Sequence, residues 1–474
     1  MDPEPENSAS CAGASLSPRL IRPPNSCPIT FDVVEPESDD TYEKTCQSFP
    51  VTSDDSLLGK CGDPGDEQVV TMDYRDALDW LFSTQMFGIK LGLENPRRLL
   101  KEYLAYPSHG ARVIHVAGTN GKGSTCAMID SIARACGWRC GLFTSPHLID
   151  YRERIKVSGV EIPQDACTAM LTELKDLSGR MEFHPTFFEI TLALAMRWFR
   201  ERDCELIVLE TGMGGRLDAT TAVPADVCVI TPVGLDHTQW LGDSLETIAA
   251  EKAGVIVPGK PVVSAPQEYS VRQVLEREAN ERRAPLEFVA EPLSGYGLAL
   301  AGEHQRWNAA LAVAALHLAG LPLNTDSVRY GLAQVNWPGR FDRIRPDVVL
   351  DGAHNPHSAK ALVETWNAVF PNRKAAFVFS AVAAKDIPGM LAILAPIAAR
   401  FFFCPVDTPR AVAAGELASD LPPDAPPHEI YDTFQAAFAA AQAHGPPILV
   451  AGSLFLVGEA RAFLMDSEFQ SSAQ

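Results

Sequence analysis

The stretch His115-Val116-Ala117-Gly118-Thr119-Asn120-Gly121-Lys122-Gly123-Ser124-Thr125 decides the fold of this chain. It follows a short apolar run, 113–117, that is typical of a buried strand. It precedes a helix pattern, 125–136, that stops at Gly137, a residue suited to a left-handed cap. Glycines let backbone N–H groups converge on one point, and a helix N-terminus carries partial positive charge. The stretch therefore predicts a phosphate-binding loop between a strand and a helix.

Lys122 adds a full positive charge to this loop, and Ser124 or Thr125 could reach a bound Mg²⁺. The stretch departs from the standard Walker A pattern. Val116 stands where that pattern has its first glycine, and Gly123 follows the lysine directly where Ser or Thr is expected. A glycine-rich turn with a solvated lysine is the alternative interpretation. The strand before, the helix after and the hydroxyls at the helix start favour phosphate binding.

Length and charge limit the class of protein. The 474 residues are enough for two or three domains with real cores. A net charge of -20 argues against a nucleic-acid partner or an anionic membrane partner. No apolar run approaches the ~20 residues of a membrane span. The 11 cysteines form no CxxC pair, which favours free thiols in a reducing compartment and predicts a cytoplasmic protein.

Residues 1–70 differ from the rest of the chain. They hold 14 acidic and 4 basic residues, so half of the net charge lies there. The segment is rich in Pro and Ser and poor in periodic apolar residues, a composition that cannot bury enough surface to fold. It has neither the apolar run of a secretory signal nor the basic character of a mitochondrial presequence. We interpret it as a disordered acidic extension.

Strands and helices alternate through the remainder, which predicts an α/β fold with mostly parallel sheets. The aromatic and proline run at 337–341 interrupts the pattern and looks like a linker. The predicted organisation is a nucleotide-binding domain of P-loop type at 71–336, a linker at 337–343 and a smaller Rossmann-like α/β domain at 344–474. The expected strands are 113–117, 139–143, 205–210, 227–231, 286–289, 348–350, 376–379, 401–404 and 448–451.

Polar residues follow several of these strands, at the sheet edge where open α/β folds place their ligands. Glu210 ends a buried strand, where a carboxylate beside a phosphate loop suits Mg²⁺. A capping or solvated glutamate is the alternative interpretation, but the glycine-rich continuation 211–215 favours a ligand site. His237 follows the next strand, and 351–358 occupies the same place in the second domain. Lys252, near a helix C-terminus, reads by itself as a surface lysine.

Six motifs together resemble folylpolyglutamate synthase/dihydrofolate synthase, a family of the Mur ligase superfamily. The resemblance runs from about Tyr74 to near the C-terminus, and the order and spacing of the motifs make it specific. The motifs are Gly118-Thr119-Asn120-Gly121-Lys122-Gly123-Ser124-Thr125, Thr144-Ser145-Pro146-His147, Gly214-Gly215-Arg216-Leu217-Asp218-Ala219-Thr220, Leu235-Asp236-His237-Thr238, Glu251-Lys252-Ala253-Gly254 and Asp351-Gly352-Ala353-His354-Asn355-Pro356-His357.

The resemblance implies a ligase that uses ATP and Mg²⁺. ATP phosphorylates a substrate carboxylate, and the amino group of L-glutamate attacks the acyl phosphate to form an amide. Phosphorylation is needed because oxide is a very poor leaving group, and metal ions neutralise charge on the transferred phosphoryl group. The implied partners are small molecules only, namely dihydropteroate, folates, L-glutamate and ATP. A monomer is the family expectation.

The resemblance also assigns residues, and three of them, Lys122, Lys252 and His354, are expected to be catalytic. Lys252 matches a lysine that is carbamylated in this superfamily, which overrides its reading as a surface residue. Ser145, Glu210 and His237 are implied metal ligands. The expected ATP contacts are Thr119, Asn120, Gly121, Lys122, Gly123, Ser124, Thr125, Asn308, Arg340 and Asp351. Phe188, Asp218 and Ala219 would line a pterin site, and Arg154, His354 and Ser453 would meet the incoming glutamate.

The run Gly215-Arg216-Leu217-Asp218-Ala219-Thr220 resembles enzymes that use dihydropteroate as well as folates, which predicts a bifunctional enzyme. Two departures concern substrate preference: Thr221 stands where Asn is usual, and 380–386 lacks the usual Gly and first Asp. One alternative is polyglutamylation alone. A second is another Mur-type amino-acid ligase, which would carry a UDP-binding N-terminal domain. A third is a P-loop switch or motor, which would need a strict Walker A motif.

Overall fold

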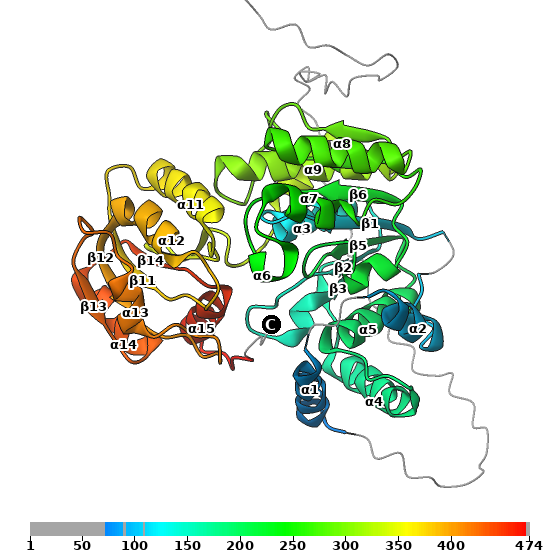
Figure 1. The fold of residues 1–474 in the computed structure, drawn as a ribbon, viewed down its shortest axis with the longest axis horizontal. Coiled ribbons are helices and arrows are strands. Elements are labelled where there is room, and N and C mark those ends of the chain that lie inside the picture. Colours follow the sequence, from blue (N-terminus) through cyan, green and yellow to red (C-terminus); the bar gives the residue numbers. More distant parts are fainter. Residues whose placement is uncertain (1–71, 89–91, 108–109, 471–474) are drawn as a thin grey trace, which may run out of the picture. The chain divides into compact units, whose positions relative to one another are not determined.

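The computed structural model describes residues 72–470 except 89–91 and 108–109. These residues form two sheets with mostly parallel strands, and helices cover both faces of each sheet. Figure 1 follows them in chain order, the first sheet in blue to green and the second in yellow to red. The α/β class is confirmed. The predicted extension, 1–70, lies outside the described residues.

The first sheet has the strand order β4-β3-β2-β5-β1-β6-β7-β8. Strands β2 to β3 and β3 to β4 pair antiparallel, and all the other neighbours pair parallel. The loops that follow β1, β2, β5 and β6 therefore leave the same edge. The strands are β1 (Arg112–Ala117), β2 (Cys140–Phe143), β3 (Ile155–Val157), β4 (Val160–Glu161), β5 (Leu206–Glu210), β6 (Val227–Ile230), β7 (Val262–Ser264) and β8 (Leu286–Phe288).

Two layers of helices enclose this sheet. One layer holds α3 (Lys122–Ala135), α9 (Glu303–Leu318) and α10 (Thr325–Ala333). The other holds α1 (Tyr74–Ser83), α2 (Glu94–Glu102), α4 (Gln164–Arg180), α5 (Phe187–Glu201), α7 (Leu245–Ala253) and α8 (Tyr269–Glu281). The short helices η1 (Thr84–Phe87), η2 (Tyr151–Arg154), η3 (Ala219–Ala222) and α6 (Thr238–Leu241) complete this part of the chain.

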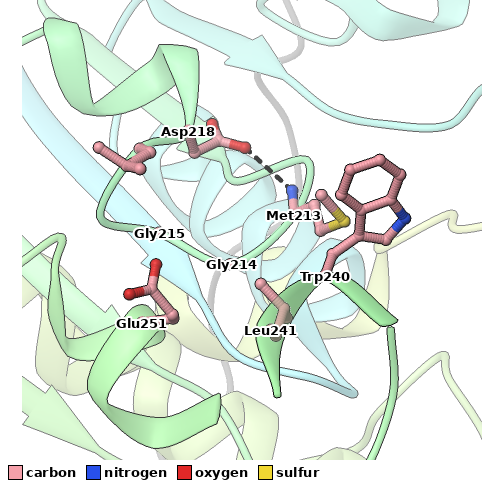
Figure 2. A pocket seen from close by; sticks show the side chains of 8 residues that line it. Met213, Gly214, Gly215, Asp218, Trp240, Leu241 and Glu251 are labelled. Atoms are coloured by element: carbon pink, nitrogen blue, oxygen red, sulfur yellow. Dashed lines mark hydrogen bonds between the residues drawn. The ribbon is translucent and has the colours of Figure 1, made fainter. Parts of the chain in front are cut away.

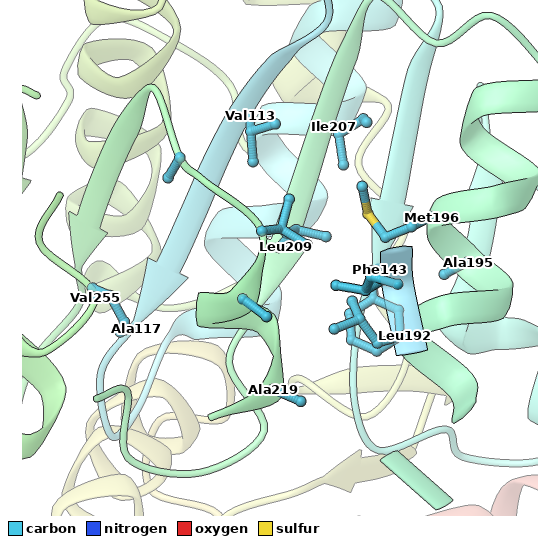
Figure 3. Close-up of a cluster of buried hydrophobic side chains, with 14 of the residues drawn as sticks. Val113, Ala117, Phe143, Leu192, Ala195, Met196, Ile207, Leu209, Ala219 and Val255 are labelled. Carbon is cyan, nitrogen blue, oxygen red and sulfur yellow. The ribbon is translucent and has the colours of Figure 1, made fainter. Parts of the chain in front are cut away.

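The apolar faces of the central strands form the core of the first sheet. Successive strand residues point to opposite faces, so Val113 and Leu209 face one helix layer while Val116 faces the other. Figure 3 shows Val113 and Leu209 on neighbouring strands, with Leu192 and Met196 of α5 packed over that face. Burial on both faces explains why these strands read as continuous apolar runs in the sequence.

The second sheet has the strand order β13-β12-β11-β14-β10-β9, and all neighbours are parallel except the pair β9 and β10. Its strands are β9 (Asp342–Arg345), β10 (Val348–Asp351), β11 (Ala375–Phe379), β12 (Ala398–Phe403), β13 (His428–Ile430) and β14 (Ile448–Ala451). Helices α11 (Pro356–Val369), α12 (Ile387–Leu394) and α13 (Ala414–Ser419), with η4 (Ala395–Ile397), cover one face. Helices α14 (Phe434–His444) and α15 (Leu454–Met465) cover the other.

Four phenylalanines on β11 and β12 form the centre of the second core. Phe377 stacks on Phe401 with ring centroids 5.1 Å apart, and Phe401 stacks on Phe403 at 5.4 Å. Phe379 meets Phe401 and Phe403 edge to face. All four side chains are fully buried. Large aromatic side chains dominate core energetics, so this layer holds α12 and α13 to the sheet.

Three boundaries differ from the sequence prediction. Helix α3 begins at Lys122, three residues before the predicted start, because Gly121 adopts a φ of +90° and the chain turns directly into the helix. The stretch 303–308 reads in the sequence as a loop before a helix, but helix α9 already begins at Glu303, so Asn308 lies within it. Strand β9 begins at Asp342, so the last two residues of the predicted linker 337–343 lie in a strand.

Two further observations concern the described residues only. No helix there is long and apolar enough to cross a bilayer. Seven cysteines there carry free thiols, and burial raises the pKa of several of them, including Cys126 and Cys228. Thiols with a raised pKa are poor nucleophiles, which agrees with a structural role.

The phenylalanine layer gives a prediction about stability. Phe401→Ala should lower the free energy of unfolding of the second sheet by roughly 3–5 kcal/mol, because it removes a fully buried ring and leaves a cavity. Denaturant unfolding followed by tryptophan fluorescence would measure the loss. Phe463→Ala is the control, because this ring is 48% exposed. Equal losses for the two variants would contradict the proposed weight of the layer.

Candidate active site

The loop after β1 is held rigidly by the chain that follows β6. The backbone N–H groups of Thr119 and Asn120 both donate to the carbonyl of Pro232. The Thr119 hydroxyl donates to the Gly234 carbonyl at 2.9 Å and accepts from the Gly234 N–H at 3.0 Å. These bonds fix the backbone before α3 begins. A loop held in this way presents its remaining N–H groups without further reorganisation.

Close approach requires glycine at the start of α3. Gly121 has a φ of +90°, and a Cβ there would lie 2.6 Å from Oδ1 of Asn308. A Cβ on Gly123 would lie 2.9 Å from the ring of Trp337. Helix α3 has no side-chain hydrogen bond at its N-cap, so the helix start offers backbone donors to a ligand. Asn308, a predicted ATP contact, therefore lies against the loop.

Two ammonium groups converge on one carbonyl in this loop. Nζ of Lys252 donates to the Gly118 oxygen at 2.8 Å, and Nζ of Lys122 donates to the same oxygen at 3.2 Å. Lys252 is buried, and burial together with the charge of Lys122 lowers its pKa to about 7. The structure thus contradicts the reading of Lys252 as a surface lysine. Two neighbouring cations repel each other, so an anion bound here would be stabilised.

Glu210 and Ser145 meet at the ends of β5 and β2. The Ser145 N–H donates to Oε2 of Glu210 at 3.0 Å. The Glu210 carboxylate is buried, which raises its pKa, while Lys122 acts in the opposite direction. Val116 of β1 pairs with Glu210 in the sheet register, which places the carboxylate beside the phosphate-binding loop. A buried carboxylate beside a cation and an open loop is a suitable metal ligand.

His237 adopts a left-handed backbone conformation, with a φ of +51°, at the start of α6. Burial lowers the pKa of its imidazole to about 4, with contributions from Lys385 and Lys122, so the ring is neutral and able to bind a metal. Lys122 thus influences both Glu210 and His237. No cluster of three or more His, Cys, Asp or Glu side chains with metal-site geometry occurs among the described residues. Mg²⁺ does not need one, because it binds through few carboxylates and keeps several waters.

The first helical turn of α3 holds the two predicted hydroxyls. Ser124 accepts a long contact of 3.5 Å from Gln305, and both residues are buried. The Thr125 hydroxyl is buried and has no hydrogen-bond partner among the described residues. A buried hydroxyl without a partner is unfavourable, so these two positions fit a bound ion or phosphate oxygen.

Asp236 links the two sheets, a role that sequence reasoning missed. Its Oδ1 lies 2.5 Å from Nζ of Lys385, and its Oδ2 lies 3.4 Å from Nε2 of His354 and 3.2 Å from Nδ2 of Asn355. Burial alone would raise the pKa of Asp236, but His354 and Lys385 together hold it far below its usual range. Asp236 lies next to His237 in one of the six motifs, but the sequence gives no signal for its contacts with Lys385, His354 and Asn355.

Asn120 makes a second contact between the two sheets. Its side-chain amide exchanges hydrogen bonds with that of Asn355 at 3.2 and 3.1 Å, and it lies 2.9 Å from Nδ1 of His357. Asn355 is also the N-cap of α11. The start of α11 is therefore tied to the phosphate-binding loop through two asparagine side chains.

The other residues predicted in the second half lie near the ends of β10 and β14. The Asp351 carboxylate accepts the N–H groups of Phe341 and Ala353 at 2.8 Å each, and burial raises its pKa. The Arg340 guanidinium packs against Gly352 and lowers the pKa of Asp351. Ser453 is buried and caps α15 by accepting from the Phe455 N–H at 3.2 Å. Asp351 and Ser453 thus use their oxygens within the fold in this arrangement.

Arg154 is wholly buried, which sequence reasoning did not anticipate. Its Nε donates to Nδ1 of His147 at 2.8 Å, and its guanidinium lies over the ring of Phe187. Burial lowers the pKa of Arg154 to about 10. Gln470, near the C-terminus, accepts from Nε2 of His147 through its carbonyl. The predicted contact between Arg154 and free glutamate therefore requires rearrangement of these neighbours.

A recess lies beside the loop that follows β5, and Figure 2 shows it with Asp218 and Met213 joined by a hydrogen bond. The Met213 N–H donates to Oδ2 of Asp218 at 2.9 Å. Phe188 lies against Gly212, because a Cβ there would meet its ring at 2.8 Å. Trp240, which is 46% exposed, also lines the recess. Sequence reasoning named Phe188, Asp218 and their neighbour Ala219 but not Trp240.

Two family models match this chain. The model described as "Mur ligase middle domain" matches 116–281, and the one described as "Mur ligase, glutamate ligase domain" matches 339–454. They cover the central part of the first sheet and most of the second. The class is therefore that of the Mur ligases, and the predicted ligase class is confirmed.

One curated relative and two solved structures are similar to this chain over nearly their whole length. The "Dihydrofolate synthase/folylpolyglutamate synthase" of Bacillus subtilis (strain 168) is 34% identical over 424 residues, 82% of this chain and 98% of the relative. A structure of the E. coli protein in complex with DHPP and ADP matches with a TM-score of 0.76 and 32% identity, covering 84% of this chain and 99% of that one. The Yersinia pestis bifunctional enzyme, complexed with AMPPNP and Mn ion, matches with a TM-score of 0.75 and 31% identity, covering 85% and 100%.

The chain belongs to the folylpolyglutamate synthase/dihydrofolate synthase family. This confirms the family resemblance that the six motifs indicated. A P-loop switch or motor is excluded as a description of the chain.

The Asp236 cluster gives a prediction about stability. Asp236→Asn should lower the free energy of unfolding by up to about 3–5 kcal/mol, because it leaves the partly buried ammonium of Lys385, whose side chain is 12% exposed, without its counter-charge. Thermal unfolding of the ligand-free protein would measure it. Asp326→Asn is the matched control, because its side chain is 94% exposed and its ion pair with Arg329 should contribute at most about 1 kcal/mol. An unchanged unfolding midpoint for Asp236→Asn would contradict the assigned role.

Proposed function

We propose that this protein joins L-glutamate to dihydropteroate, giving dihydrofolate, and to the γ-carboxylate of folates, with ATP as the second substrate. The observation that carries the proposal is the pair of ammonium groups on the Gly118 carbonyl at the start of α3. An ATP phosphate chain would meet the ammonium group of Lys122 and the helix N-terminus, while carbamylation of Lys252 would remove the repulsion between the two lysines. The relatives crystallised with ADP or AMPPNP support this choice of ligand.

The proposed reaction has two steps. The substrate carboxylate attacks the γ-phosphorus of ATP, the bond to the bridging oxygen breaks, and ADP leaves with an acyl phosphate formed. The glutamate amine then attacks the acyl carbon, loses a proton, and expels phosphate as the amide forms. The first step needs charge neutralisation and alignment. Lys122 and the N–H groups at 119–123 would supply these at the β- and γ-phosphates, and Asn308, Arg340 and Asp351 would make further contacts to the nucleotide.

Residues that follow three strands would bind the metal. The Ser145 N–H donates to the Glu210 carboxylate. The charge of Lys122 acts on the pKa of both Glu210 and His237, and the imidazole of His237 is neutral. Bound Mg²⁺ would neutralise charge on the transferred phosphoryl group. Ser124 and Thr125, with their poorly satisfied hydroxyls, would take a phosphate oxygen or the ion.

Lys252 would work as a carbamate. A pKa of about 7 leaves a large unprotonated fraction near neutral pH, and only the free amine attacks carbon dioxide. Carbamate formation releases one proton and turns a cation into an anion. It removes the repulsion from Lys122 and leaves one N–H that can still donate to Gly118. The resulting carboxylate would bind metal.

The recess at 213–218 would hold the pterin ring. Asp218, which lines the recess, would offer acceptor oxygens to ring N–H and amino groups, and Phe188, whose ring lies against Gly212, and Ala219 would complete the pterin contacts. Incoming glutamate would meet His354, Ser453 and Arg154. Polyglutamylation alone is the second candidate function, because the departures at Thr221 and 380–386 concern substrate preference.

Steady-state assays would test the proposal directly. The purified protein should release ADP with dihydropteroate, L-glutamate and MgATP, and with tetrahydrofolate in place of dihydropteroate. Product mass should rise by one glutamate residue. Turnover with tetrahydrofolate only would reduce the proposal to polyglutamylation. Turnover with neither acceptor would refute it.

Lys122 gives a prediction about activity. Lys122→Ala should reduce kcat by at least about 100-fold, because the transferred phosphoryl group loses its nearest fixed charge. The unfolding midpoint should change little, because this side chain is only partly buried and contacts its own loop. Lys101→Ala, at an exposed helix position, is the control. Normal turnover in Lys122→Ala would remove its assigned role.

Lys252 gives a second prediction. Lys252→Ala should be inactive and should recover part of its activity with millimolar acetate or formate, which can occupy the vacated space as a carboxylate. Lys260→Ala, a partly exposed lysine paired with Asp226, should need no rescue. Intact-mass or ¹³C NMR measurement after addition of labelled bicarbonate should detect the carbamate in the unmodified protein. A fully active Lys252→Ala would end the carbamate hypothesis.

A further inference from the structure

His115 is a polar side chain in the apolar layer under the recess. It lies on β1 between Ile114 and Val116, on the face that Val113 and Ala117 share. Only 1% of its surface is exposed, and burial lowers its pKa to about 3, so the imidazole is neutral. Placing an imidazole in such a layer is unfavourable unless its nitrogens find partners. The catalytic proposal above makes no use of it.

A chain of two hydrogen bonds leads from His115 to Asp218. Nε2 of His115 lies 2.7 Å from Oγ1 of Thr220, and the Thr220 hydroxyl donates in turn to Oδ1 of Asp218. A hydroxyl has a single hydrogen, so Oγ1 can only accept from the imidazole. His115 must therefore carry its proton on Nε2. The direction of the whole chain points toward the carboxylate.

The chain fixes the carboxylate that faces the recess. Oδ1 of Asp218 accepts from both the N–H and the hydroxyl of Thr220, and Oδ2 accepts from the Met213 N–H at 2.9 Å. Thr220 itself is fully buried in η3, and its rotamer is held by the imidazole behind it. Three donors on an anionic group hold its plane in one orientation and offset part of the cost of its burial.

We propose that His115 and Thr220 are positioning residues for the acceptor substrate: they orient Asp218 so that its carboxylate meets the N–H donors of the bound pterin. The inference rests on the proposed function, because Asp218 contacts the acceptor substrate only if the recess holds the pterin ring. It extends the site into the sheet, to residues that never touch the substrate. The N–H donors of a rigid ring form stronger hydrogen bonds with a carboxylate that is already held in the matching orientation.

A buried histidine that merely satisfies its own hydrogen bond would behave differently. Its loss would lower the stability of the first sheet, with no preference among substrates. A positioning role instead raises KM for dihydropteroate and leaves KM for ATP unchanged, because the phosphate-binding loop does not depend on Asp218. The split between the two KM values therefore separates the interpretations.

The test uses paired variants of the full chain. Thr220→Val and His115→Met remove the chain while keeping side-chain bulk. Thr220→Ser keeps the hydroxyl, and His115→Gln keeps a donor near the position of Nε2. We expect KM for dihydropteroate to rise about tenfold in the first pair and less than about threefold in the second, as for loss of one hydrogen bond to a charged group. Thr365→Val, a buried threonine of α11 that bonds only a backbone carbonyl, is the matched control.

The outcomes distinguish a positioning role of His115 and Thr220 from a purely structural role. KM for ATP should stay within about twofold in all variants. The double variant His115→Met/Thr220→Val should have a KM for dihydropteroate no higher than that of the more impaired single variant, because both substitutions break the same chain of hydrogen bonds. Equal changes in both KM values, or no change in the dihydropteroate KM of soluble Thr220→Val, would overturn the inference while leaving the proposed function intact. Absence of dihydropteroate turnover in the unmodified protein would overturn the inference and reduce the proposed function to polyglutamylation, and absence of turnover with tetrahydrofolate as well would overturn both. ¹⁵N NMR of the imidazole should show the Nε2–H tautomer, and the opposite tautomer would also contradict the chain.

Discussion

The rest of the site depends on the hydrogen bonds between the segment that follows β6 and the loop that follows β1. Pro232 and Gly234 hold Thr119 and Asn120 through four hydrogen bonds, and α3 starts directly beyond them. Because the backbone is fixed, Gly118 can present its carbonyl to two lysines. Lys122 and Lys252 are thereby placed beside the proposed site of the phosphate groups. Parallel strands make this possible, because they deliver every loop of the site to one edge.

Electrostatics distinguish the roles of the buried groups around this loop. Burial raises the pKa of Glu210 and lowers that of His237 and Lys252, so each is shifted toward its neutral form. Asp236 shows the opposite behaviour, because His354 and Lys385 hold it charged. The first three groups lack full counter-charges in the protein alone and are suited to a charged ligand. Asp236 is already paired with Lys385 and His354, and these contacts connect the two sheets.

The sequence predicted the features that arise locally. Buried parallel strands such as β5 and β14 are continuous apolar runs, and the left-handed Gly137 after α3 was read from its residue type. The hairpin of β3 and β4, which turns at Ser158-Gly159, escaped notice because each strand is very short. Strand β9 was missed because charged residues alternate along a sheet edge. Contacts such as Asp236 with Lys385 join residues 149 positions apart, and no local pattern reports them.

The account rests on the claim that ATP activates the acceptor carboxylate as an acyl phosphate. Dihydropteroate labelled with ¹⁸O in its carboxylate would test this claim most directly. If the carboxylate oxygen attacks phosphorus, one ¹⁸O atom per turnover must appear in inorganic phosphate, which ³¹P NMR detects as an isotope shift. We predict one labelled oxygen in each phosphate released with the amide. Unlabelled phosphate, formed at the same rate as the amide, would contradict the mechanism.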